Sequence, residues 1–111
     1  MTIPELLNKY QLHDSTLEDI RFPDTHSVEL IIDVCLWMQD NYQDTEPETQ
    51  IQRFIFEKVI SCEYDEYSID SDSILEARLL GEQTLELVVL SETDGDCHII
   101  RICAQCVHIS I

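Results

Sequence analysis

Basic residues are scarce in this sequence. Six Lys and Arg stand against 23 Asp and Glu, so the formal net charge at pH 7 is −17. Such a surface repels the phosphates of nucleic acids and the headgroups of anionic membranes, because like charges repel. We therefore expect no nucleic-acid partner and no membrane partner, and we expect attraction to a basic protein partner. The alternative explanation is that the charge only maintains solubility.

Long apolar runs are also absent. Runs such as LVVL at 87–90 are only a few residues long, far fewer than the ~20 residues that a membrane-spanning helix needs. The first residues, MTIPELLNKY, lack the cationic region and the apolar stretch of a secretory signal. The sequence thus predicts a cytoplasmic protein, in which the five cysteines are reduced thiols.

Glycine is rare, with two residues in the chain, and the glycine-rich motifs of enzymes are missing. The sequence contains neither a phosphate-binding loop nor a Gly-x-Ser-x-Gly elbow. DSDSILE at 70–76 begins like an EF-hand calcium loop but lacks the glycine at the sixth position. We therefore predict a protein that is not an enzyme and that has no cofactor, no catalytic residue and no metal ligand.

Apolar residues make up 44% of the chain and favour a folded protein, and 111 residues fit a single domain, 1–111. TIPE at 2–5 forms a capping box and is followed by apolar residues at helical spacing, which predicts a helix over 3–10. Further on, apolar residues alternate with polar ones, or β-branched and aromatic residues gather. These patterns predict strands at about 15–22, 27–38, 50–61, 74–80, 84–90 and from 97 onward. The first of these is favoured over a helical turn, which the capping-box pattern at 15–18 also fits.

The connections between the later segments are short. GEQ at 81–83 and ETDGD at 92–96 are typical of hairpins, and strands joined by short turns are antiparallel. The predicted fold is therefore α+β and mainly β, with an antiparallel sheet of five or six strands and one short N-terminal helix. We expect the sheet to be a meander, and a strongly curved or a sandwich-like form is compatible with this pattern.

Acidic residues are concentrated in three segments that contain no Lys or Arg, at 40–48, 63–76 and 92–96. With only six bases in the whole chain, most of these carboxylates are expected to lack a cationic partner and to attract a cationic surface. The predicted partner-binding residues are Asp44, Glu46, Glu48, Asp65, Glu66, Asp70, Asp72, Asp94 and Asp96.

LHDS at 12–15 places a histidine beside a carboxylate and a hydroxyl. His13 and Asp14 are the residue types of a general base or a metal site, but neighbours on a strand point to opposite faces and do not easily share a site. We favour a structural role, in which Asp14 or Ser15 caps local backbone amides and His13 bonds a carbonyl at the helix-to-strand junction. The pattern leaves the function of this motif open.

CAQC at 103–106 has the two-residue spacing of zinc and redox sites, and His108 follows closely. On an extended strand, however, positions i and i+3 lie on opposite faces and roughly 10 Å apart along the chain. We therefore expect Cys103 and Cys106 to be small buried residues. A metal-binding protein that uses His13 and the Cys103 and Cys106 region is the alternative.

LHDS leading into a strand, then SVELIIDVCLW at 27–37, RFIFEKVISCEYD at 53–65 and a closing meander resemble a broad group of small, largely uncharacterised bacterial β-sheet proteins. Some members of that group are classed as immunity proteins of polymorphic toxin systems. The resemblance implies a binding protein without assigned chemistry. Together with the charge, it leads to the hypothesis of a non-enzymatic acidic protein-binding module, an immunity-type inhibitor of a basic toxin.

Overall fold

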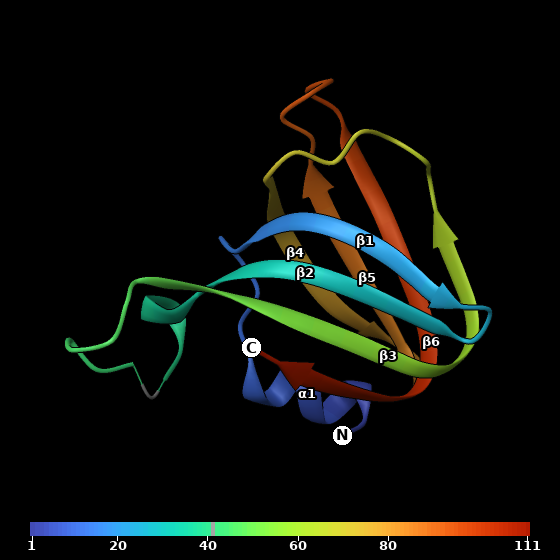
Figure 1. Ribbon diagram of the computed structural model, residues 1–111, viewed down its shortest axis with the longest axis horizontal. Helices are drawn as coiled ribbons and strands as arrows, with labels where there is room; N and C mark the ends of the chain where they lie inside the picture. Colours follow the sequence, from blue (N-terminus) through green and yellow to red (C-terminus); the bar gives the residue numbers. More distant parts are fainter. Residues whose placement is uncertain (41) are drawn as a thin grey trace.

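The computed structural model describes residues 1–40 and 42–111 (Figure 1). Within these residues a short helix, α1 (Ile3–Lys9), precedes six strands, and a 3₁₀ helix, η1 (Leu36–Met38), follows the second strand. The strands are β1 (Thr16–Asp24), β2 (Ser27–Cys35), β3 (Thr49–Tyr64), β4 (Asp72–Leu80), β5 (Thr84–Leu90) and β6 (Cys97–Ser110). Each strand pairs antiparallel with its neighbours, so the predicted fold class is confirmed.

The strands are ordered β1-β2-β3-β6-β5-β4, and β4 also pairs with the start of β1, so the sheet closes into a barrel. The chain forms two three-stranded meanders, β1-β2-β3 and β4-β5-β6, which join where β3 pairs with β6. A single continuous meander would have paired β3 with β4. The connection at 65–71 crosses the end of the barrel instead (Figure 1), and it is longer than the two to five residues of a typical hairpin loop.

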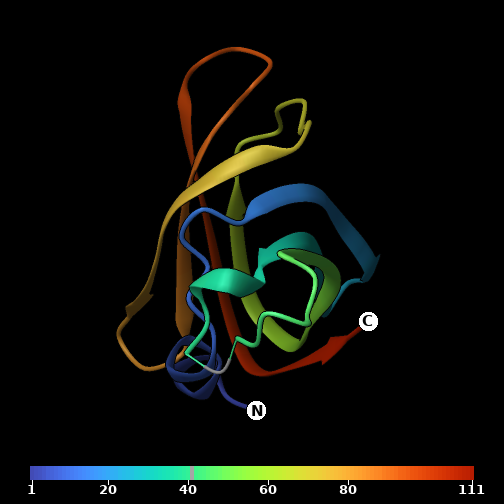
Figure 2. The ribbon, with the colours of Figure 1, turned by 90° about the vertical axis from the view of Figure 1, so that its left-hand side faces the viewer.

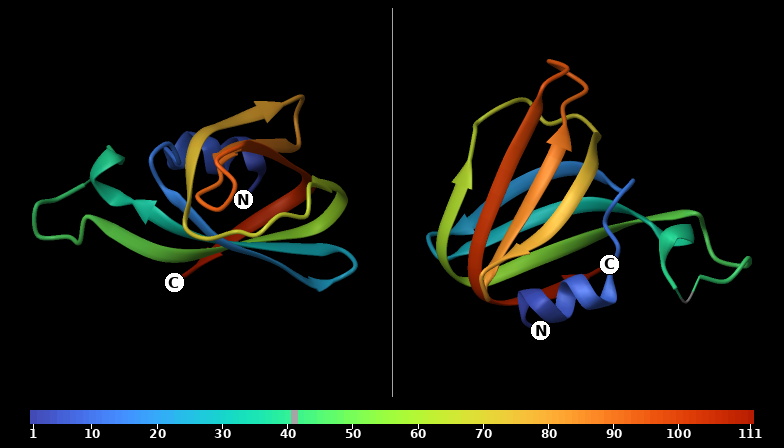
Figure 3. Two further views of the ribbon diagram at one scale, coloured as in Figure 1. Left: turned by 90° about the horizontal axis from the view of Figure 1, so that it is seen from above. Right: turned by 180° about the vertical axis from the view of Figure 1, so that it is seen from behind.

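The two longest strands, β3 and β6, each contribute to both halves of the barrel. β3 pairs with β2 as far as Phe56, and beyond that residue it pairs only with β6. Between these parts Lys58 adopts a φ of 52°, and the register with β6 shifts between Val59 and Ser61. The Val59 amide donates to the His26 carbonyl (2.9 Å) at the tip of the β1–β2 hairpin. β3 therefore bends around this hairpin, as both views of Figure 3 show.

Alternating apolar residues of the strands fill the barrel. On β2 the face that the sequence predicts to be apolar is buried at Val28, Leu30, Ile32 and Val34. The first half of β3 adds Phe54 and Phe56, both fully buried. Removing apolar surface from water stabilises a fold by about 25 cal/mol per Å², so these side chains carry much of its stability.

The N-terminal helix covers the lower end of the barrel (Figure 2). Its capping box is present, because the Thr2 hydroxyl accepts from the Glu5 amide (3.3 Å) and the Glu5 carboxylate accepts from the Thr2 amide (3.1 Å). Ile3 and Leu6 are buried in the core. The predicted helix over 3–10 is thus confirmed to within one residue. Among the residues described, neither α1 nor η1 has the length and apolar character that crossing a membrane requires.

The strand predicted over 27–38 ends at Cys35, and the next three residues form η1. The amides of Leu36 and Trp37 both donate to the Glu48 carbonyl (2.8 and 3.4 Å), so the backbone turns away from the sheet. Apolar residues continue at every second position through η1, and the pattern alone therefore predicts a strand that is too long.

Candidate functional site

The arginines lie on the outer face of the sheet, opposite carboxylates on neighbouring strands. One row of alternating charge crosses β4, β5, β6 and β3 in register, and it consists of Arg78, Glu86, Arg101 and Glu63. Glu86 is 1% exposed and accepts from both arginines, with Arg101 Nε at 2.7 Å. Arg101 Nη1 also donates to Glu63 (3.1 Å). This row joins four strands by ion pairs.

The other two arginines pair on β1, β2 and β3. Arg53 donates to Glu29, which is 4% exposed, and Arg21 donates to Asp19 (2.9 Å). Hydrogen bonds from the arginines hold the pKa of Glu29 and of Glu86 below the ordinary value for a glutamate. All four arginines are therefore paired, and the remaining bases are two lysines.

The Glu86→Gln substitution is expected to lower the free energy of unfolding at neutral pH. The difference from the wild type is expected to become smaller as the pH falls. A carboxyl with a lowered pKa in the folded state stabilises the fold above its ordinary pKa of 4.5. That contribution is lost as the pH falls through the folded-state pKa. Urea unfolding of the wild type and the variant, from neutral pH to about pH 3, measures the difference between them.

Glu82→Gln is the matched control for this prediction, because Glu82 is exposed in the β4–β5 turn. Its effect on the free energy of unfolding should be small at every pH. If the wild type remains more stable than Glu86→Gln by the same or a larger free energy of unfolding in acid, the ionised Glu86 does not have the stabilising role assigned to it.

Two of the three acidic segments come together at one end of the barrel. The Thr93 hydroxyl in the β5–β6 turn donates to the Ser68 carbonyl in the β3–β4 connection (3.2 Å). Figure 1 shows these two connections at the top of the molecule. We call their exposed carboxylates the acidic rim, which consists of Asp65, Glu66, Asp70, Glu92, Asp94 and Asp96. In the described part of the chain, no Lys or Arg forms an ion pair with these residues.

Asp94 shapes the β5–β6 turn as well as carrying charge. Its Oδ1 accepts from the Asp96 amide (2.8 Å), and its Oδ2 lies 2.8 Å from Nε2 of His98. These bonds, first the one from the backbone and then the one from His98, lower the pKa of Asp94. Gly95 adopts a φ of 75°, a conformation that glycine tolerates best. Two bonds to its carboxylate thus position Asp94 within the turn.

Asp72 was predicted to bind a partner, and this prediction is wrong because Asp72 is fully buried. It begins β4 at the closure of the barrel, opposite Leu17 of β1, and its Oδ1 accepts from the Glu92 amide (2.9 Å). Burial first, and then the charge of Asp72, raises the pKa of the Tyr67 hydroxyl above its ordinary value. Asp72 thus ties the barrel closure to the β5–β6 turn. In the sequence it resembles a loop residue because acidic and polar residues surround it.

The third acidic segment lies elsewhere. Asp44, Glu46 and Glu48 are exposed in the connection between η1 and β3. This connection projects to the left in Figure 1, away from the acidic rim, and the right-hand view of Figure 3 shows the same separation. Trp37, which is 52% exposed, precedes it. The structure therefore separates these three predicted binding residues from the others.

A row of aromatic rings runs from the β1–β2 hairpin to the acidic rim. The ring centroids of Phe22 and Tyr64 lie 6.2 Å apart, those of Tyr64 and Tyr67 lie 6.1 Å apart, and Tyr67 stacks on His98 at 3.8 Å. Phe22 is 53% exposed. Burial first, and then charges that include Glu66, raises the pKa of Tyr64. The aromatic row therefore lies in the negative field of the rim.

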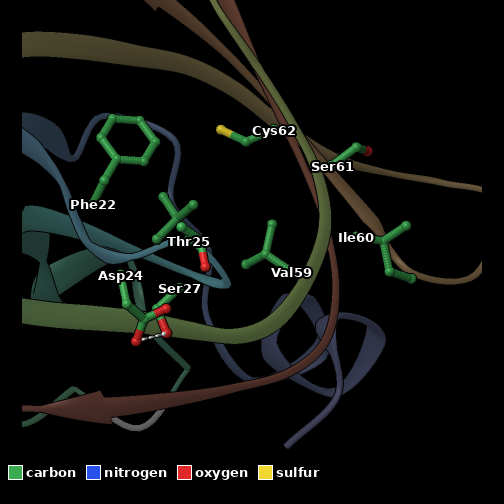
Figure 4. Close-up of a pocket in the computed structure, with 9 residues that line it drawn as sticks. Phe22, Asp24, Thr25, Ser27, Val59, Ile60, Ser61 and Cys62 are labelled. Atoms are coloured by element: carbon green, nitrogen blue, oxygen red, sulfur yellow. Dashed lines mark hydrogen bonds between the residues drawn. The ribbon is translucent and has the colours of Figure 1, made fainter.

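A groove of about 630 Å³ opens at the Phe22 end of this row, between the hairpin and the bent part of β3 (Figure 4). In Figure 4, Phe22 and Thr25 face Val59 and Cys62 across the groove, whereas Ile60 points to the other side of β3. Burial raises the pKa of the Cys62 thiol, as expected for an apolar wall. The aromatic row thus connects the exposed carboxylates of the rim with an exposed ring and a groove at the β1–β2 hairpin.

LHDS forms a turn between α1 and β1 and is not part of a strand. His13 and Asp14 are exposed, and their Nδ1 and Oδ2 atoms lie 3.3 Å apart. Asp14 has a φ of 67°, so the expectation that the two side chains point to opposite faces is wrong. The His13 ring forms no hydrogen bond to a carbonyl within the described residues. Ser15 has the structural role instead, because its buried hydroxyl accepts from the Cys35 amide (2.9 Å) at the distant end of β2.

Ser15→Ala is expected to lower the free energy of unfolding by about 1–3 kcal/mol, because it leaves a buried amide without a hydrogen-bond partner. Ser15 is 1% exposed and Cys35 is 3% exposed, so water cannot replace the hydroxyl without rearrangement. Urea denaturation measures the change. Ser61→Ala, at an exposed position on β3, should change the free energy by less than about 0.5 kcal/mol. Equal effects of the two substitutions would contradict the assigned role.

Cys103 and Cys106 lie on β6, as predicted, but they are half-buried and do not belong to the core. The core positions in this part of β6 are Ile102, Ala104 and Val107. Within residues 1–40 and 42–111, no three His, Cys, Asp or Glu side chains are grouped so that they could hold a metal ion. His13 and the two thiols are therefore not brought together, and the metal-binding alternative gains no support.

Sequence patterns missed the aromatic row and the groove. Tyr64 and Tyr67 occur in EYDEYSID at 63–70, where acidic residues dominate and no strand period is visible. Nothing near Phe22 in the sequence indicates that it faces Tyr64 and Cys62, because this contact depends on how the barrel closes. The only local indication of the aromatic row was the pair of tyrosines between acidic residues in this segment.

Comparisons of the chain with protein-family models, with curated proteins and with solved structures found no significant match. The resemblance that begins at LHDS therefore stays a prediction. The acidic rim, the aromatic row and the groove are the features of the structure that bear on function.

Proposed function

We propose that the protein is a non-enzymatic acidic module that binds a basic protein through the acidic rim, as an immunity-type inhibitor of a basic toxin would. One observation carries the proposal. The four arginines pair with carboxylates on the strands, whereas in the described part of the chain the six rim carboxylates have no Lys or Arg partner. Their field is therefore free to attract a cationic surface.

The aromatic row supports a protein partner over a simple cation. Stable protein interfaces usually combine a few well-packed aromatic anchors with a polar border that excludes water. Phe22 is 53% exposed at the edge of a groove, and the acidic rim begins immediately after Tyr64. The rim would steer the partner during its approach, and the aromatic side chains would supply contact area once it is bound.

A nuclease toxin is a chemically suitable partner. An enzyme that binds nucleic acid presents Lys and Arg to phosphates, and most of its affinity for nucleic acid comes from these contacts. A set of closely spaced carboxylates offers the same residues an alternative anion. A module with a net charge of −17 would thus bind the substrate-binding face of such an enzyme and exclude its substrate.

Affinity capture from the native organism at low salt tests the proposal. The wild type is compared with a variant in which Asp65, Glu66 and Asp70 are replaced by lysine. We expect the wild type to retain basic proteins that elute as the salt concentration rises, because salt screens charge interactions. A toxin gene adjacent to the gene of this protein would name the first candidate partner.

If the wild type captures proteins that are no more basic than those captured by the lysine variant, the rim does not select a cationic partner. The carboxylates would then serve only to keep the protein soluble.

A further inference from the structure

We infer that the groove between the β1–β2 hairpin and the bent part of β3 receives an arginine side chain of the basic partner, with its guanidinium stacked on Phe22. The inference rests on the proposed function and deepens it, because it names the side chain that the partner inserts.

The walls of the groove suit the stem of a long side chain. Val59 and Cys62 line one side and Thr25 faces them from the hairpin (Figure 4). The groove is open to solvent and measures about 630 Å³, so a side chain can enter without rearrangement of β3. Arginine places three methylene groups against apolar walls while its charged head remains near water.

Phe22 offers a ring to a cation at the mouth of the groove. More than half of its surface is exposed, although the tilted contact with Tyr64 holds the ring in place. A guanidinium over an aromatic face is attracted by the negative charge density of the ring, and it also stacks with its own plane. The exposed ring is thus a surface that a planar cation covers well.

One carboxylate lines the groove and others lie near the aromatic row that leads to it. Asp24 lines the groove, and its side chain is fixed by the His26 amide (2.7 Å) and the Ser27 hydroxyl (3.2 Å). The charges of Glu66 and Asp19 act on Tyr64 at the other end. Lys58 does not line the groove, but it lines an adjoining hollow that shares Asp24 and Val59 with it. Among the described residues, Asp24 is thus the one charged residue that lines the groove, and the chain around it carries a net charge of −17, which favours a cationic occupant.

Arginine meets these conditions better than the other residues that a partner can insert. An apolar side chain would match the walls but would gain nothing from the carboxylates. A lysine ammonium would be attracted to the carboxylates, but it is compact, strongly hydrated and unable to stack. Guanidinium is planar and more weakly hydrated, so it can stack on the ring of Phe22 and interact with the carboxylates at the same time.

Two peptides of equal charge, octa-arginine and octa-lysine, test the inference by calorimetric titration at low ionic strength. We expect the wild type to bind octa-arginine about two- to fivefold more tightly than octa-lysine, the ratio that an exposed cation–π contact supports. Phe22→Leu keeps an apolar side chain but removes the aromatic ring, and it should bring this ratio close to one.

Trp37→Leu is the matched control. Trp37 is 52% exposed, close to the 53% of Phe22, and it precedes the acidic segment at 40–48, so it offers a rival site for the same peptide. We expect the substitution to leave the preference for octa-arginine unchanged. A preference that is lost with Trp37→Leu, or that survives Phe22→Leu, would overturn the assignment to the groove.

A measurement on the unaltered chain covers the case in which Phe22→Leu fails to fold. Bound octa-arginine should slow alkylation of Cys62 in the groove more than octa-lysine does, whereas the exposed Cys97 should be affected equally by both peptides. Mass spectrometry distinguishes the two thiols. Equal protection of Cys62 by the two peptides would overturn the inference.

The two proposals fail in different ways. If the wild type binds both peptides with equal affinity, the role of arginine in the groove is wrong and the acidic module remains. If the wild type binds neither peptide at low ionic strength, the rim does not attract cationic partners, and both proposals are lost.

Discussion

Replacing Asp65, Glu66 and Asp70 together by lysine is expected to slow association with the basic partner by about ten- to a hundredfold, with a much smaller change in the dissociation rate. Exposed charges at the border of an interface act mainly on the approach of the partner, and steering of this kind raises association rates by about 10–10³-fold. These three residues are exposed, and none has a side-chain hydrogen bond within the described residues. Stopped-flow or surface-binding kinetics measure both rates.

The matched control reverses three acids in the segment that the structure separates from the rim. Lysine at Asp44, Glu46 and Glu48 changes the net charge by the same amount but acts at another part of the molecule. We expect a clearly smaller decrease in the association rate, and for both variants a weaker effect at high salt. Equal slowing by the two triple variants would show that total charge, and not the rim, governs association.

Charged residues have different roles on the strands and in the connections. Those on the strands stabilise the fold, and those in the connections are available to attract a cationic partner. On the strands, Glu86 and Glu29 are almost fully buried under arginines, and these pairs connect neighbouring strands. In the connections at 65–71 and 91–96 the carboxylates face solvent without such partners in the described chain. Composition alone predicts that most acids lack a base, but it does not tell which ones.

Most of the fold could be predicted from local patterns. The capping box at Thr2 and the period-two alternation around Leu30 each depend on neighbours in sequence, and both features lie where they were predicted. The pairing of β3 with β6 could not be predicted this way. It depends on a bend at Lys58 and on a connection that crosses the barrel, and neither leaves a periodic signal.

The candidate site was predicted only in part, for the same reason. Exposed acids such as Asp65 and Asp94 follow from composition and turn chemistry. Asp72 was misplaced because a buried carboxylate at a barrel closure looks like any other acid in an acidic stretch. The contact of Phe22 with Tyr64 joins the first strand to the end of the third, and only the closed barrel brings these residues together.

Phe54→Ala is expected to lower the free energy of unfolding by about 3–5 kcal/mol, a large part of the 5–15 kcal/mol that typically stabilises a domain. Phe54 is fully buried, lies on the strand shared by both halves of the barrel, and packs against Tyr10 with ring centroids 5.9 Å apart. Its removal leaves a cavity that the strands on either side cannot close. Chemical denaturation followed by tryptophan fluorescence and circular dichroism measures the loss.

Phe22→Ala is the counterpart that separates stability from binding. Phe22 is 53% exposed, so truncation should cost about 1 kcal/mol or less, mainly through its contact with Tyr64. In the partner-binding assay, however, the loss of this aromatic anchor should weaken affinity at least about tenfold. If Phe22→Ala destabilises the fold as much as Phe54→Ala, Phe22 is a core residue of the hairpin. Its weaker binding would then follow from unfolding and not from the loss of a contact.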